Sequence, residues 1–185
     1  LDQNTSNQIA AGEVVEKPAS VVKELVENSL DAGADTIEVS IFAGGTEFIR
    51  VRDNGSGMDE ANARMAILRH ATSKIVKADD LLTLHTLGFR GEALPSIASV
   101  SHFTLLTREA GAEFATRITL DGGEDMDVES MGGDVGTTIT VKDLFYNVPA
   151  RRKFLRTVNT EGRYISDILS KIALSRPDVH LVLTR

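Results

Sequence analysis

Residues 103–141 consist of short runs, rich in apolar residues and threonine, that glycines separate. The glycines are Gly111, Gly122-Gly123, Gly132-Gly133 and Gly136. Such runs predict strands, and the glycines predict the turns between them. Strands that follow one another directly do not fit the strand–helix alternation of a doubly wound parallel sheet.

Helical spacing of apolar residues is found on both sides of this strand region. It predicts helices over residues 5–16, 18–31 and 59–70, from residue 91 to about residue 100, and around residues 165–173. Runs of alternating apolar and polar residues on either side of Gly44-Gly45 predict a hairpin of two strands. Residues 179–184 are predicted to form a last strand. Residues 71–90 show no clear period, and we interpret them as a surface loop with one helical turn. This order predicts an α+β fold, a two-layer sandwich with helices on one face of a mixed, mostly antiparallel sheet, formed by residues 1–185 as one domain.

The composition limits the possible chemistry. The 185 residues include no cysteine, which excludes disulfides, a thiol nucleophile and sulfur-ligated zinc. With 20 Lys and Arg against 27 Asp and Glu, the net charge of −7 disfavours tight binding of the whole chain to nucleic acid. No apolar run is long enough to span a membrane, and the first residues do not have the pattern of a signal peptide.

The predicted helix over residues 18–31 carries the first candidate site. At 100° per residue, one half of this helix is apolar and contains Val21, Val22, Leu25, Val26 and Leu30. Glu24, Asn28 and Asp31 fall together at the border of the apolar half. A glutamate there can deprotonate a water, and an asparagine oxygen can coordinate Mg²⁺. The same pattern also fits polar residues that simply border a core helix.

Asp53 ends the second strand of the hairpin, on the same side as the apolar Ile49 and Val51. A carboxylate on the buried side needs donors, and the amine of an adenine, a water or a backbone amide would serve. Gly55 and Gly57 follow and permit a tight turn close to a flat ligand. Alternatively, Asp53 caps the next helix from within an ordinary turn.

Gly88 and Gly91 precede the helix that begins near residue 91. Backbone N–H groups at such a position attract phosphate, and Arg90 adds positive charge. The segment is neither a Walker A loop nor a dinucleotide-binding motif, because the chain has no Gly-Lys dipeptide and no G-x-G-x-x-G spacing. It also fits an ordinary loop-to-helix junction.

The basic residues at 151–156 are better explained by a solvated helix start or by ion pairs than by contact with DNA.

Four motifs follow one another in an order that resembles the Bergerat ATP-binding fold of the GHKL superfamily. They are E-x-x-x-N at 24–28, D-x-G-x-G at 53–57, the glycine loop at 88–94 and Gly136-Thr137-Thr138. That superfamily includes gyrase, heat-shock chaperones, histidine kinases and MutL. The chain further resembles the MutL branch of mismatch-repair proteins over essentially its whole length. The segments that carry this resemblance are N-Q-I-A-A-G-E-V-V-E at 7–16, K-E-L-V-E-N-S-L-D-A at 23–32, R-H-A-T-S-K-I at 69–75, G-F-R-G-E-A-L at 88–94 and N-V-P-A-R at 147–151.

The resemblance implies roles for the matching residues. It implies Glu24 as the general base, Asn28 as the Mg²⁺ ligand and Asp53 as the partner of the adenine amine. Gly57 would border the base, Thr137 would support the contact of Asp53 with adenine, and residues of about 74–91 would form a lid over the phosphates. The implied ATP-binding residues are Asn28, Asp31, Ala32, Asp53, Gly57, Met58, Thr72, Lys74, Gly88, Phe89, Arg90, Gly91, Glu92, Ala93, Leu94 and Thr137.

The implied activity is slow, Mg²⁺-dependent hydrolysis of ATP by a domain that acts as a nucleotide-driven dimerisation switch in DNA mismatch repair. The implied partners are ATP and ADP, a second copy when ATP is bound, a MutS-type mismatch sensor, a downstream nuclease or helicase, and DNA bound weakly by the parent protein, with no membrane. The implied location is the cytoplasm, at the nucleoid, in a bacterium, or the nucleus in a eukaryote.

The resemblance also bears on whether this chain is sufficient for turnover. MutL-like ATPases complete their site with a lysine from a following transducer domain, which would begin about where residue 185 lies. We therefore expect this chain alone to bind nucleotide and to hydrolyse ATP weakly or not at all. The alternatives are the ATPase domain of another GHKL member and a nucleotide-binding module without turnover.

Overall fold

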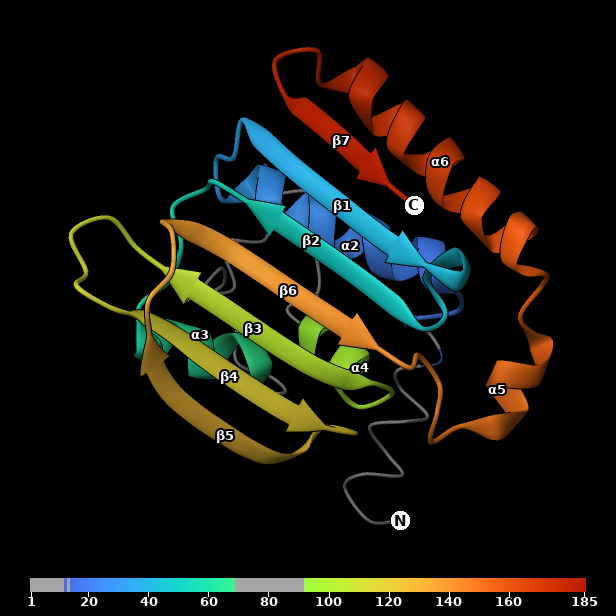
Figure 1. Cartoon of the computed structure of the whole chain (residues 1–185), viewed down its shortest axis with the longest axis horizontal. Coiled ribbons are helices and arrows are strands. Elements are labelled where there is room, and N and C mark those ends of the chain that lie inside the picture. Colours follow the sequence, from blue (N-terminus) through green and yellow to red (C-terminus); the bar gives the residue numbers. More distant parts are fainter. Residues whose placement is uncertain (1–11, 13, 69–91) are drawn as a thin grey trace, which may run out of the picture.

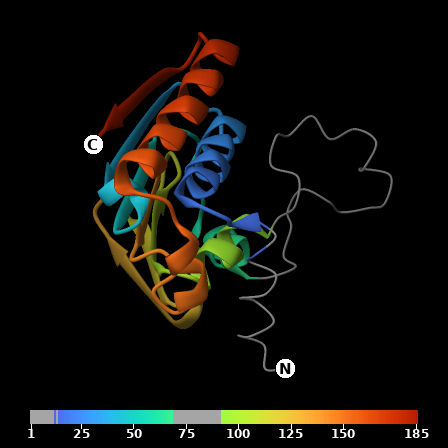
Figure 2. The same cartoon turned by 90° about the vertical axis from the view of Figure 1, so that its right-hand side faces the viewer.

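The structure is a computed structural model that describes residue 12, residues 14–68 and residues 92–185. These residues form two layers, a seven-stranded sheet and a set of helices (Figure 1). Seen from the side, the main helices pack against the same face of the sheet (Figure 2). The predicted α+β sandwich is confirmed.

The sheet is antiparallel except at one edge. Its strands lie in the order β5 (Glu124–Met131), β4 (Ala115–Asp121), β3 (His102–Arg108), β6 (Gly136–Lys142), β2 (Phe48–Asp53), β1 (Thr36–Phe42) and β7 (His180–Thr184). Among the described strands only β1 and β7 pair in parallel. The position of β6 between β3 and β2 brings the start of β6 beside the end of β2, with Asp53 opposite Thr137.

The helix layer consists of α2 (Pro18–Asp31), α3 (Glu60–Ile67), α4 (Ala93–Ala98) and α6 (Val158–Ser175), and the connections contain α5 (Pro149–Phe154) and the 3-10 turn η1 (Ala43–Gly45). Helix α2 begins at Pro18, which suits the first helical position, and Gly33 follows its end with a φ of 75°. Asp59 caps α3 by accepting the N–H of Asn62 at 2.7 Å.

The core lies between the sheet and the helices. Alternate strand residues such as Ile37, Val39, Ile49 and Val51 are buried there, as the period-two pattern predicts. Helix α2 contributes the apolar half that the helical wheel predicts: Val21, Val22, Leu25, Val26 and Leu30. Because Asp53 shares the inward side of β2 with these apolar residues, its carboxylate is held next to α2.

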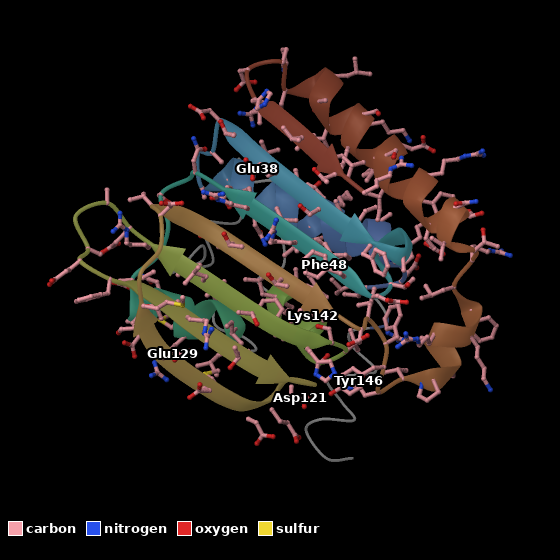
Figure 3. The ribbon with its side chains drawn as sticks, in the orientation of Figure 1. Glu38, Phe48, Asp121, Glu129, Lys142 and Tyr146 are labelled. Atoms are coloured by element: carbon pink, nitrogen blue, oxygen red, sulfur yellow. The ribbon has the colours of Figure 1, made fainter. Side chains whose placement is uncertain are left out.

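The other face of the sheet carries polar side chains, including Glu38, Lys142 and Glu129 (Figure 3). At one end of this face the rings of His102 and Tyr146 stack with centroids 4.1 Å apart. Both contact Asp121, His102 through Nδ1 at 2.9 Å and Tyr146 through its hydroxyl. Burial and the Asp121 carboxylate raise the pKa of Tyr146 to about 12.

The predicted elements differ from the observed ones mainly at their ends. The helix predicted from residue 91 to about residue 100 is observed as the shorter α4, and the last helix begins earlier, at Val158. Helix α5, with Arg151, Arg152 and Lys153 in its last turn, was expected only as a possible helix start. The helix predicted over residues 5–16 and the loop over 71–90 lie almost wholly outside the described residues. No helix in the described ranges is long and apolar enough to cross a membrane.

Candidate functional site

Asp53 is a carboxylate at the end of β2 that is only 9% exposed. Its Oδ2 accepts a hydrogen bond from the hydroxyl of Ser29 on α2 at 2.7 Å. Its Oδ1 accepts the backbone N–H of Gly55 at 2.9 Å and that of Thr137 at 3.3 Å. These three donors satisfy the buried charge and hold the carboxylate in one orientation. Asp59, and not Asp53, caps α3, so the alternative prediction of Asp53 as a helix cap is wrong.

The glycine turn after β2 is held against the end of α2. The N–H of Ser56 donates to the carbonyl of Ala32 at 2.9 Å. A Cβ at Gly55 would lie 2.9 Å from the Cβ of Ala32, so only a residue without a side chain fits this approach. The turn therefore keeps Asp53 beside the C-terminal end of α2.

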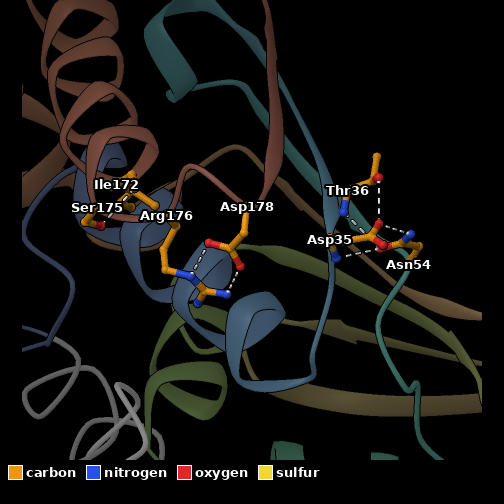
Figure 4. A network of polar contacts seen from close by, with 7 residues as sticks. All are labelled: Asp35, Thr36, Asn54, Ile172, Ser175, Arg176 and Asp178. Carbon is orange, nitrogen blue, oxygen red and sulfur yellow. Dashed lines mark hydrogen bonds and ion pairs between the residues drawn. The ribbon is translucent and has the colours of Figure 1, made fainter.

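Asn54 ties the same turn to the start of β1 (Figure 4). Its Oδ1 accepts the N–H groups of Asp35 and Thr36 at 3.1 Å and 3.0 Å, and its Nδ2 donates to the Asp35 carboxylate at 2.7 Å. The hydrogen bonds from Asn54 and Thr36 lower the pKa of Asp35. Figure 4 also shows Arg176 paired with Asp178 at 2.8 Å in the connection that leads into β7. These contacts fix the sheet edge next to the site.

Thr107 connects the glycine turn to β3 and β6. It is 1% exposed, and its Oγ1 accepts the N–H of Met58 at 2.9 Å. The same Oγ1 lies 2.9 Å from the Thr137 hydroxyl and 3.2 Å from the carbonyl oxygen of Gly136. Thr137 therefore contacts Asp53 through its backbone N–H, while its hydroxyl contacts Thr107.

We expect Thr107→Val to lower the free energy of unfolding by about 1–3 kcal/mol, because the N–H of the half-buried Met58 loses its acceptor while the side-chain shape is kept. Thr104→Val on the opposite face of the same strand is the control and should change it by less than about 0.5 kcal/mol. Urea denaturation measures both changes. Equal losses in the two variants would contradict the bridging role of Thr107.

Glu24 and Asn28 lie one turn apart on α2, and both are half-buried at the border of its buried side. Ser29, which holds Asp53, directly follows Asn28. At 1.5 Å per residue, Glu24 lies about 7.5 Å from Ser29 along the helix axis. Asp53, Asn28 and Glu24 thus follow one another from the C-terminal toward the N-terminal half of α2.

The remaining predicted site residues are placed as follows. Asp31 ends α2 and Ala32 follows it, both half-buried, and Glu92 and Ala93 stand at the start of α4. Leu94 is a core residue, so its side chain packs inward and is not available to a ligand. The predicted lid over 74–91 and six predicted site residues lie outside the described residues, namely Thr72, Lys74, Gly88, Phe89, Arg90 and Gly91.

Sequence reasoning missed Ser29 and Thr107. Both are polar residues at positions where the local period predicts a buried side chain. Ser29 lies between Val26 and Leu30 on α2, and Thr107 shares the inward side of β3 with Leu105. A buried hydroxyl needs a partner, and this signal could have identified both residues.

The side-chain carboxamide of Asn28 is a candidate oxygen ligand for a phosphate-bound Mg²⁺. In the described ranges no group of three or more His, Cys, Asp or Glu is placed to hold a metal. Mg²⁺ is commonly held by one or two protein oxygens together with substrate phosphates and water. The half-buried carboxamide of Asn28, between Asp53 and Glu24 along α2, fits that mode of binding.

Comparison with known proteins agrees with this geometry. Residues 16–131 match the family described as "Histidine kinase-, DNA gyrase B-, and HSP90-like ATPase". The chain is 36% identical to the Aquifex aeolicus MutL ATPase domain complexed with ADP, with a TM-score of 0.77 over 92% of this chain and 60% of that one. A structure described as the N terminal domain of a DNA repair protein has a TM-score of 0.80 at 29% identity, over 96% of this chain and 51% of that one.

Two curated relatives are more similar in sequence. The "DNA mismatch repair protein MutL" of Geobacter sulfurreducens is 56% identical and that of Trichlorobacter lovleyi 57% identical, each over 97% of this chain. The chain spans only about 30% of the length of either relative. The mixed sheet, covered on one face by helices and carrying a buried aspartate beside α2, is the architecture of a GHKL ATPase domain. The chain belongs to the family of histidine kinase-, DNA gyrase B- and HSP90-like ATPases.

Proposed function

We propose that this chain is the ATP-binding and slowly ATP-hydrolysing domain of a MutL-type DNA mismatch-repair protein. The observation that carries the proposal is the buried Asp53 carboxylate, fixed by Ser29 on the helix that also holds Asn28 and Glu24. An acceptor-only carboxylate in a buried position suits the exocyclic amine of adenine. Asp53 also lies beside the border of α2 that carries Asn28, the proposed metal ligand, and Glu24, the proposed general base. This arrangement suits a nucleoside triphosphate.

The order of residues along α2 suggests how the nucleotide lies. The base binds at Asp53, next to the Gly55–Gly57 turn, and the triphosphate extends along α2 past Asn28 toward Glu24. We propose that the lid implied for residues of about 74–91, which lie outside the described residues, covers the phosphates. Asn28 would hold Mg²⁺, which would neutralise part of the phosphate charge.

Glu24 acts as the general base. It accepts a proton from a water whose oxygen attacks the γ-phosphorus, and the bond from that phosphorus to the bridging oxygen of ADP breaks. Its half-buried position leaves the carboxylate partly shielded from bulk solvent. ADP and phosphate are the products.

The names of the relatives support a role for this chemistry in DNA mismatch repair. We propose that ATP binding drives self-association of the whole protein and changes its contacts with a MutS-type mismatch sensor, with a downstream nuclease or helicase, and weakly with DNA. For a bacterial source we propose a cytoplasmic location at the nucleoid.

The variant Asp53→Asn tests the proposed contact between Asp53 and the adenine amine. We expect a loss of ADP and ATP affinity of about tenfold or more, because the carboxylate is replaced by a group with only one acceptor oxygen. Titration calorimetry with and without Mg²⁺ measures the affinity, and thermal unfolding verifies that the variant is folded. Asp35→Asn is the matched control, since Asp35 lies in the exposed network next to the same turn. Unchanged nucleotide affinity in Asp53→Asn would overturn the assignment of Asp53 as the partner of adenine.

A further inference from the structure

The hydroxyl of Ser29 faces two acceptors. Its Oγ lies 2.7 Å from Asp53 Oδ2 and 3.1 Å from the carbonyl oxygen of Leu25, and Ser29 is 3% exposed. A serine carries one hydroxyl proton and donates it to one acceptor at a time. The carboxylate is the stronger acceptor and lies at the shorter distance, so the proton goes to Asp53.

The donors around Asp53 leave room for one more at a defined oxygen. Each carboxylate oxygen offers about two acceptor positions. Both positions of Oδ1 are used, by the N–H groups of Gly55 and Thr137. Among the described residues Oδ2 receives only Ser29, so the remaining acceptor position is on Oδ2, next to the serine hydroxyl.

We infer that Ser29 is a positioning residue that acts through Asp53 and sets the preference of the site for a 6-aminopurine over a 6-oxopurine. This inference rests on the proposed function, because it takes the ligand of Asp53 to be a purine base. By occupying one side of Oδ2, Ser29 directs the other acceptor position of that oxygen at the ligand. A 6-amino group donates to this position, whereas a 6-oxo group is itself an acceptor and is rejected.

Loss of the hydroxyl has a specific consequence. In Ser29→Ala the Asp53 carboxylate keeps its two donors on Oδ1, but Oδ2 has no protein donor among the described residues and is free to turn toward water. We therefore expect the affinity for ADP to fall by about fivefold, which corresponds to one hydrogen bond of about 1 kcal/mol. The affinity for inosine diphosphate, which has a 6-oxo group, should stay within about twofold, because that nucleotide does not use Oδ2.

The experiment measures ADP by titration calorimetry and inosine diphosphate by competition with ADP, in this chain and in Ser29→Ala. The expected result is a fall of about fivefold in the ratio of the two affinities. Asp53→Asn and the double variant complete a mutant cycle. If Ser29 acts through Asp53, then Ser29→Ala has no further effect on ADP affinity in the Asp53→Asn background.

Ser101→Ala is the matched control. Ser101 is a fully buried serine whose hydroxyl donates to the carbonyl oxygen of Ile97, four residues earlier, at 2.7 Å. The Ser29 hydroxyl lies 3.1 Å from the equivalent carbonyl oxygen of Leu25, but it donates to Asp53. Its removal should lower the unfolding midpoint without changing the ratio of the affinities. If Ser29→Ala does not fold, Ser29→Cys keeps the side-chain size with a poorer donor and must show the same fall in the ratio.

Equal weakening of both nucleotides in Ser29→Ala, or additive losses in the double variant, would overturn the inference and leave Ser29 a structural residue. An unchanged ratio in a folded variant would overturn it as well. In both cases ADP binding by the unaltered chain would leave the proposed function standing. Failure of the unaltered chain to bind ADP would instead overturn the proposed function, and this inference with it.

Discussion

Replacement of Glu24 by alanine is expected to lower the rate of ATP hydrolysis by about 10²- to 10⁴-fold, the usual contribution of a positioned general base. Nucleotide binding should remain within a few-fold, because the base contact at Asp53 and the metal ligand Asn28 are unchanged. The rate is best measured in a protein of the full length of the relatives above, because this chain spans only about 30% of that length. Release of labelled phosphate with enzyme in excess over ATP makes a slow reaction measurable.

Glu27→Ala is the control for this prediction. Glu27 lies on the same helix, three residues after Glu24, and pairs with Lys23 at 2.9 Å. Loss of such a pair costs only a few tenths of a kcal/mol, and turnover should be unaffected. Equal turnover in Glu24→Ala and in the unaltered protein would refute the role of Glu24.

Gly136→Ala should give the largest loss of stability, roughly 3 kcal/mol or more. Gly136 begins β6 with a φ of 120°, and a Cβ there would lie 2.1 Å from the backbone oxygen of Asp53 and 3.0 Å from the Cα of Asn54. A side chain would therefore push the start of β6 away from the end of β2. Because the N–H of Thr137 holds Asp53, nucleotide affinity should fall with stability.

Two other glycines separate the causes of that loss. Gly111 has a φ of 86° in open space, so Gly111→Ala measures backbone strain alone, of about 1 kcal/mol. Gly132 has neither a positive φ nor a neighbour within 4 Å of an added Cβ, so Gly132→Ala should be neutral or slightly stabilising. Denaturant unfolding compares all three variants. A loss in Gly136→Ala no larger than that in Gly111→Ala would show that the contact with β2 tolerates a side chain.

Local patterns were sufficient to predict several parts of the structure. The bounds of α2 follow from a proline at its start and a glycine after its end, and the structure has the same bounds. The hairpin of β1 and β2 follows from alternation on either side of Gly44-Gly45. The burial of Asp53 follows from its place in the same alternation as Ile49 and Val51. Each of these rests on residues that are near one another in the chain.

Local patterns were not sufficient for the partners of Asp53. Ser29 lies 24 residues before Asp53 and Thr137 lies 84 residues after it. Neither contact has a sequence period, since each depends on the order in which the strands and α2 pack. The role of Thr107 was missed for the same reason, because the turn it holds is 49 residues away.

The sequence by itself therefore determined the type of each main element, the inward and outward sides of the strands, and the residues available for chemistry, because these depend on periods of two or 3.6 residues. Only the tertiary structure decided that β6 lies between β3 and β2 and that β7 pairs in parallel with β1. It also decided that Ser29, Asp53, Thr137 and Thr107 form one network. The physical reason is that a buried carboxylate takes whichever donors the packed layers bring within about 3 Å of it, and hydrogen bonds of this kind join residues without regard to their separation along the chain.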